Sequence, residues 1–93
     1  MDQLEYARST VQQQIEALEI VRDQLGDEFL RAVDAVFGCQ GRVIVSGVGK
    51  AGIIGMKISA TLASTGIPSY WMHAVEARHG DLRRVMPDDV VLA

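Results

Sequence analysis

Several things are scarce in this chain, and each scarcity excludes a class of protein. Its 93 residues include one cysteine and two prolines, and no apolar run nears the roughly 20 residues of a membrane span. The single Cys39 excludes an internal disulfide and suits a reducing compartment, so we expect a cytoplasmic protein with no membrane partner. Nine basic residues stand against 12 acidic ones and form no basic stripe, which argues against a nucleic-acid partner.

The first part of the chain predicts two amphipathic helices. Apolar residues recur at helical spacing over residues 2–25 and again up to Gly38, with Gly26 and Asp27 suited to the turn between them. We therefore assign residues 1–40 to an N-terminal helical hairpin. The apolar stripe of the first helix is expected to be core or subunit interface rather than a cofactor site; it includes Leu4, Val11, Ile15 and Leu18.

After Gly41 the pattern changes to alternating strands and helices. We expect strands at residues 42–46, 68–72 and 89–93, a helix at 52–65 closed by Gly66, and a short helical or irregular piece at 74–79. Helices between strands imply parallel pairing, so residues 41–93 form an α/β domain with a parallel sheet. The sequence stops at its third strand without the loop and helix that usually follow, and we expect a truncated domain.

A glycine-rich turn joins the first predicted strand to the helix after it. It contains Gly47, Gly49 and Lys50, in the run GVGKAGIIG at residues 47–55. Glycines allow close approach of a ligand, backbone N–H groups at a helix start attract anions, and a lysine adds positive charge. This combination predicts a phosphate ester as the ligand, although Lys50 could also be a solvated lysine.

Two familiar nucleotide motifs match this turn poorly. The Walker motif needs a glycine where Ile44 stands and a serine or threonine where Ala51 stands. A dinucleotide-binding turn fits the glycine spacing, but it needs an acidic residue after the next strand, where the sequence has Met72 and His73. An oxidoreductase that binds a dinucleotide is therefore a secondary alternative.

Three segments in order resemble the arabinose-5-phosphate isomerase family of sugar isomerase (SIS) domains. They are GVGKAGIIG at 47–55, ASTGIP at 63–68 and HAVEARHGDL at 73–82. The resemblance implies the first half of a Rossmann-like, three-layer SIS domain and a homo-oligomer without a cofactor. It also implies an isomerase that interconverts ribulose 5-phosphate and arabinose 5-phosphate, on the route to an octulosonate sugar of lipopolysaccharide.

The resemblance also assigns residues to roles. Lys50 matches a catalytically important lysine, and His73 matches a position that can take an inhibitory zinc ion. The matches to substrate-contacting positions are Gly66, Ile67 and His79. His73 could instead end a strand and hydrogen-bond the backbone, since two histidines alone make a poor zinc site. His79 could be a simple turn residue.

A second alternative is a regulator that binds a phosphosugar without turnover, because SIS domains also occur in regulators. We further expect that this chain alone does not isomerise sugar phosphates at a useful rate. In the family a Ser/Thr-rich phosphate loop and further acidic and histidine catalytic positions follow the third strand, and losing even one preorganised donor costs about 10²–10³ in rate.

Overall fold

The computed structural model describes residues 2–93, apart from the side chain of Asp81. The chain divides into two compact units, Met1–Ala32 and Val33–Ala93. In chain order the elements are α1 (Gln3–Gln24), α2 (Asp27–Phe37), β1 (Val43–Val45), α3 (Lys50–Ser64), β2 (Ser69–Trp71), α4 (Ala74–Arg78), the 3-10 helix η1 (Asp81–Arg84) and β3 (Val90–Leu92). Within residues 2–93, no helix combines the length and apolar character needed to cross a membrane.

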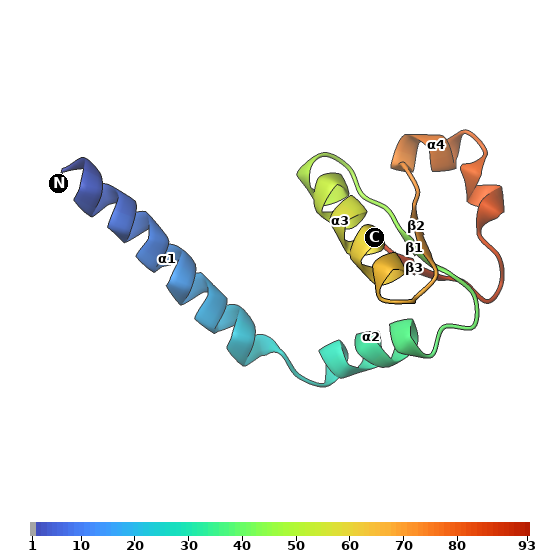
Figure 1. Cartoon of the computed structure of the whole chain (residues 1–93), viewed down its shortest axis with the longest axis horizontal. Coiled ribbons are helices and arrows are strands. Elements are labelled where there is room, and N and C mark those ends of the chain that lie inside the picture. The colour runs from blue at the N-terminus through green and yellow to red at the C-terminus, as the bar shows by residue number, and fades with distance from the viewer. Residues whose placement is uncertain (1) are drawn as a thin grey trace. The chain divides into compact units, whose positions relative to one another are not determined.

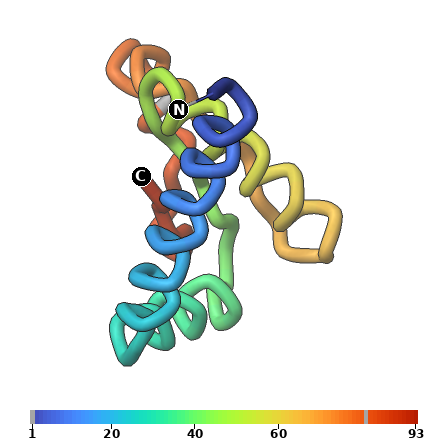
Figure 2. The backbone as a smooth tube through the Cα atoms, turned by 90° about the vertical axis from the view of Figure 1, so that its left-hand side faces the viewer, coloured from blue at the N-terminus to red at the C-terminus, as the bar shows by residue number. Residues whose placement is uncertain are grey.

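The first unit is dominated by α1, which runs as one straight coil (Figure 2). A capping box starts it: Asp2 accepts the Glu5 N–H at 2.7 Å, and Glu5 accepts the Asp2 N–H at 3.2 Å. The apolar stripe of α1 is not covered within this unit, since Leu18 is 68% exposed and even Ile15 is 43% exposed. Both predicted helices are present, while their pairing into a hairpin and the domain boundary at residue 40 stay predictions.

The second unit contains a three-stranded parallel sheet in the order β2-β1-β3 (Figure 1). Val43 of the central strand pairs with Ser69 on one side and with Val90 on the other. The three residues of β1 are each at most 2% exposed: β1 is the central strand, and α3 also packs on it. The predicted α/β fold with a parallel sheet is confirmed.

Helix α3 packs on the sheet through small residues. A Cβ atom placed on Gly55 would lie 2.9 Å from the Trp71 ring and 3.1 Å from Val45, so only glycine permits this approach. Nearer the end of the helix, the hydroxyls of Ser59 and Ser69 hydrogen-bond at 2.8 Å, and Ser69 donates to the Val43 carbonyl at 2.7 Å. Helix α3 is therefore held close to β1 and β2 along its length.

The ends of α3 differ partly from the prediction. The helix begins at Lys50, two residues before the expected Gly52, because Gly49 serves as its N-cap and accepts the Ile53 N–H at 3.2 Å. At the other end Gly66 adopts a positive φ of 94°, and Ile67 N–H donates to Leu62 at 3.0 Å. This Schellman turn confirms Gly66 as the residue that closes the helix.

The segment before β3 contains η1, which the sequence analysis did not predict, and it is fixed by a single carboxylate. Asp89 accepts the Arg42 N–H and the Met86 N–H, each at 2.7 Å, and its Oδ2 lies 3.5 Å from Arg42 Nη2. The Asp89 side chain is 2% exposed. It ties the start of β1 to the start of β3. A Cβ on Gly41 would collide with this carboxylate, which explains the glycine there.

Removing this carboxylate should destabilise the second unit. The Met86 and Arg42 N–H groups lower the pKa of Asp89 from its ordinary value of 3.8, outweighing the desolvation that would raise it. Its stabilising effect is therefore complete above that value and is lost as the pH falls toward the lowered pKa. We expect Asp89→Asn to lower the urea midpoint of unfolding at pH 7, measured by circular dichroism. As the pH falls below 3.8, the stability of this variant should decrease less than that of the unaltered chain.

Asp88→Asn serves as the matched control, because Asp88 is exposed and only its backbone carbonyl makes the contacts seen here. Equal midpoints for Asp89→Asn and the unaltered chain at pH 7 would contradict the role of this carboxylate.

Candidate functional site

The predicted phosphate-binding turn, residues 47–52, follows the C-terminal end of β1 and continues into the first turn of α3 (Figure 1). Gly49 has φ 63° and ψ −133°, a conformation that essentially only glycine adopts. A Cβ on Gly49 would meet nothing within 4 Å, so this side of the turn is open. The turn thus presents bare backbone at the end of the sheet where ligands of open α/β folds bind.

Lys50 is the first residue of α3, and its side chain is exposed. No acidic residue lies in the first turn of α3 and no side chain caps it. A cation at a helix N-terminus is unfavourable by the helix dipole unless an anion is also present. An anionic ligand would therefore satisfy both the lysine and the uncapped N–H groups of this helix.

Most glycines of this motif serve packing rather than ligand approach. A Cβ on Gly47 would lie 3.1 Å from the backbone of Ala51 and Gly52, and a Cβ on Gly52 would lie 3.2 Å from Trp71. Gly47 thus lets the turn fold tightly against α3, and Gly52 lets α3 approach the sheet. The role of Gly47 as a substrate contact stays a prediction, whereas Gly49 combines a required conformation with an open face.

His73 follows β2 and lies at the same end of the sheet as the turn. It is the N-cap of α4, and its Nδ1 accepts the Val75 N–H at 3.1 Å. This is the structural role that the sequence analysis gave as the alternative to zinc binding. Within the described part of the chain, no three His, Cys, Asp or Glu side chains gather as a metal site. The zinc assignment of His73 stays a prediction.

His79 lies at the C-terminal cap of α4, where its backbone N–H donates to Val75 at 3.2 Å and Glu76 at 3.1 Å. Helix α4 packs against η1, and between them lies a cavity of about 650 Å³. Its lining includes His79 together with Arg78 and Arg83. His79 therefore occupies a turn position and also borders this open hollow, and its role as a substrate contact stays a prediction.

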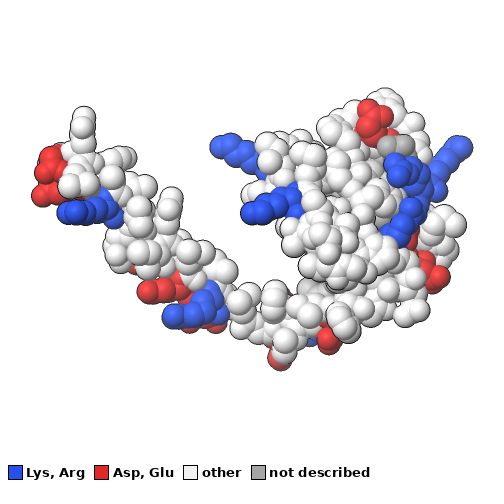
Figure 3. All heavy atoms as spheres, viewed as in Figure 1, with Lys and Arg blue, Asp and Glu red and all other residues white. Residues whose placement is uncertain are grey.

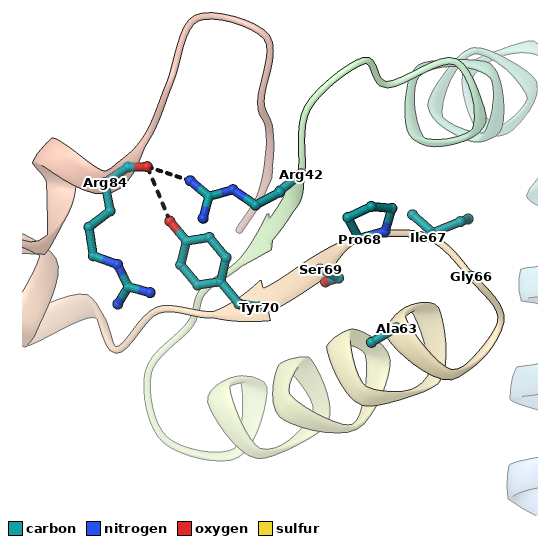
Figure 4. A pocket seen from close by; sticks show the side chains of 8 residues that line it. All are labelled: Arg42, Ala63, Gly66, Ile67, Pro68, Ser69, Tyr70 and Arg84. Atoms are coloured by element: carbon teal, nitrogen blue, oxygen red, sulfur yellow. Dashed lines mark hydrogen bonds between the residues drawn. The ribbon is translucent and has the colours of Figure 1, made fainter.

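Gly66 and Ile67 line a different cavity, of about 480 Å³ (Figure 4). They precede β2 and so lie at the N-terminal edge of the sheet. The ring of Tyr70 is bracketed there by two guanidinium groups, with Arg42 Cζ at 4.7 Å and Arg84 Cζ at 4.5 Å from its centre. Arg42 also donates to the Arg84 carbonyl at 2.8 Å.

The predicted site residues therefore fall into two groups. Lys50, His73 and His79 follow the C-terminal ends of β1 and β2, at one edge of the sheet. Gly66 and Ile67 lie at the opposite edge. The two groups therefore lie at opposite ends of the three-residue strands. The role of Gly66 and Ile67 as substrate contacts stays a prediction.

Sequence reasoning did not single out the arginines of either cavity. The one available signal was three arginines within the seven residues 78–84, in and just after the third family-like segment. Which of them face a common space depends on how α4 packs on η1, which sequence spacing does not reveal. The end of β2 carries Met72 and His73, so an acidic residue that could hold a dinucleotide ribose is missing there.

The sequence is similar to those of curated arabinose 5-phosphate isomerases. The chain is 46% identical over 89 residues to arabinose 5-phosphate isomerase GutQ of Salmonella typhi, a match that covers 96% of this chain and 28% of that protein. It is 43% identical over all 93 residues to arabinose 5-phosphate isomerase KdsD of Pseudomonas aeruginosa, again over 28% of that protein. No family model matches.

The fold of the chain is also similar to that of a solved structure. The Escherichia coli CFT073 protein c3406, solved in complex with a sugar phosphate, superimposes with a TM-score of 0.83 at 41% identity. The match covers 98% of this chain and 50% of that chain. The chain spans about 28% of the length of the curated relatives it matches. Over that stretch, in sequence and in fold, it belongs to the arabinose 5-phosphate isomerase family of phosphosugar isomerases.

Proposed function

We propose that this chain supplies the first sugar-phosphate-binding elements of an aldose–ketose isomerase that interconverts ribulose 5-phosphate and arabinose 5-phosphate. The observation that carries the proposal is the 41–46% identity to arabinose 5-phosphate isomerases along nearly the whole chain. The uncapped start of α3 with Lys50 beside an open glycine supports it, since a phosphosugar is an anion. The family's step in lipopolysaccharide precursor synthesis would then be the biological setting.

The chemistry needs three things from the protein. A proton moves between adjacent carbons through an enediolate, so a base, an electrophile for the developing oxyanion and a grip on the phosphate are required. Lys50 can stabilise the oxyanion as a cation, and His79 can bind a sugar hydroxyl.

Self-association and a cytoplasmic location complete the proposal. The outer strand β3 exposes apolar side chains, with Val91 53% and Leu92 40% exposed, and α1 exposes its apolar stripe. Uncovered apolar surface of this kind favours association with a further protein surface. The lone Cys39 suits a reducing compartment.

Titration of the purified chain tests the proposal against its alternatives. We expect arabinose 5-phosphate and ribulose 5-phosphate to raise the melting temperature, with about 2.7 kcal/mol of stabilisation at a ligand concentration of about 100 Kd. We expect no measurable conversion of one sugar phosphate into the other. Stabilisation by NAD alone would instead favour the dinucleotide-binding alternative. A longer protein that carries this segment and binds both sugar phosphates without turnover would be a regulator.

Replacing Lys50 should weaken ligand binding. We expect Lys50→Ala to lower the affinity for arabinose 5-phosphate about tenfold, because a charge-assisted contact to the ligand is lost. Calorimetric titration measures this change. Lys57→Ala, exposed on the same helix, is the matched control and should leave the affinity unchanged. An unchanged affinity for Lys50→Ala would remove Lys50 from the site.

The two histidines should respond differently. We expect His79→Ala to weaken binding of arabinose 5-phosphate severalfold, since His79 borders the hollow between α4 and η1. His73→Ala should leave the affinity nearly unchanged but destabilise the chain by roughly 0.5–2 kcal/mol, the usual effect of losing a helix N-cap. Titration and urea denaturation measure the two effects, and His73→Asn should restore the cap. The reverse pattern would contradict these assignments.

A further inference from the structure

The tryptophan at the end of β2 lies against the start of α3. The buried residues of that helix are Gly52, Gly55 and Ser59, and the two glycines face the Trp71 ring. A Cβ on Gly55 would lie 2.9 Å from Trp71 Cζ3, and a Cβ on Gly52 would lie 3.2 Å from Trp71 Cη2. The six-membered part of the indole therefore packs directly on the helix backbone at these two residues.

The same ring also lies beside the glycine turn. A Cβ on Gly52 would lie 3.1 Å from the Gly47 carbonyl oxygen, so the turn, the helix start and the indole meet at this one glycine. The backbone of Trp71 is itself fixed by the sheet. Trp71 pairs with Val45 of the central strand, and the next N–H, that of Met72, donates to the Val45 carbonyl at 2.9 Å.

The helix start has little else to hold it. The N-cap Gly49 offers no side-chain hydrogen bond, and the Ile53 N–H donates to the Gly49 carbonyl at 3.2 Å. Lys50 is exposed, and Figure 3 shows basic side chains projecting into solvent over α3. No ion pair joins Lys50 to another described side chain, so the backbone that carries it sets where its ammonium group can reach. Helix ends with few contacts fray readily.

We propose that Trp71 is a positioning residue for the phosphosugar site: its ring holds the start of α3 where Lys50 meets the anionic ligand. An aromatic side chain buries a large area, so it fixes the backbone on which it packs. Binding groups that are already in place bind more tightly than mobile ones, because less ordering accompanies binding. For the identity of the ligand this role rests on the proposed function. Neither the turn motif nor the family resemblance assigns it.

Calorimetric titration of the 93-residue chain with arabinose 5-phosphate tests this role. We expect Trp71→Ala to weaken binding about tenfold, as much as loss of the Lys50 contact itself. Trp71→Phe, which keeps an aromatic ring, should lose less affinity. Trp71→Leu repeats the test with more apolar bulk retained if Trp71→Ala does not fold. All variants are titrated at a temperature where circular dichroism shows them folded.

Ser59→Ala is the matched control. It removes the hydrogen bond between the Ser59 and Ser69 hydroxyls, which joins the later part of α3 to the sheet. It should therefore lower the urea midpoint of the chain without changing its affinity for arabinose 5-phosphate.

A double-mutant cycle shows whether Trp71 acts through Lys50. If it does, Lys50→Ala/Trp71→Ala loses clearly less affinity than the product of the two single losses, because a misplaced lysine contributes little to binding. Single losses that simply multiply would mean that Trp71 acts independently of Lys50, and would overturn the positioning role.

The chain without ligand provides a second measurement. Trp71→Ala should raise the amide hydrogen exchange of Ile53 at least about tenfold relative to that of Ile67, because the first turn of α3 frays when the ring is removed. The Ile67 N–H donates to Leu62 at the other end of the helix and serves as the internal reference. Ser59→Ala should not raise this ratio.

The outcomes separate this role from the proposed function. Equal binding of arabinose 5-phosphate by Trp71→Ala and the unaltered chain would overturn the positioning role, while phosphosugar binding stands. If the unaltered chain binds neither sugar phosphate but Trp71→Ala raises the Ile53 ratio, the contact still positions the helix start and the proposed function fails. An unchanged Ile53 ratio, or equal losses of affinity in Trp71→Ala and Ser59→Ala, would overturn the role of Trp71.

Discussion

The close contact of α3 with the sheet is the constraint on which the second unit depends. Gly52 and Gly55 bring the helix backbone against Trp71, and the Ser59 and Ser69 hydroxyls hold the later part of the helix. Any side chain at Gly55 would push α3 outward, and overpacking of this kind typically costs about 1–3 kcal/mol. Because these contacts hold α3 against the sheet, its first residue, Lys50, is positioned at the C-terminal end of β1.

The two edges of the sheet have different tasks. At the N-terminal edge Asp89, Arg42 and Tyr70 form contacts within the chain: Asp89 and Arg42 are paired with each other, and the Arg42 guanidinium lies over the Tyr70 ring. At the C-terminal edge Lys50, Arg78 and Arg83 are exposed, and no ion pair joins them to another described side chain, a set that does not include that of Asp81. Charge is thus neutralised where the fold is stabilised and left available where a ligand of an open α/β sheet would bind.

Much of this could be predicted from local pattern. Helical spacing of apolar residues located α1, and β-branched runs located β1 and β3, since each pattern follows from the backbone geometry of one element. The three family-like segments pointed to arabinose 5-phosphate isomerases, and the relatives confirm that family. The start of α3 was misplaced by two residues and η1 was not predicted. The hydrogen bonds that set such boundaries involve turns whose geometry the sequence specifies weakly.

The sequence by itself determined the order of the elements, the parallel sheet and the family, because these depend on periodicity and on short motifs. Only the tertiary structure decided which residues share a space. It put Gly66 and Ile67 at the opposite edge from Lys50, gave His73 a capping role, made Asp89 the tie between two strands, and gathered Arg78, His79 and Arg83 around one cavity. These neighbourhoods arise from packing between elements distant along the chain or turned sharply on one another, and no local pattern encodes such packing.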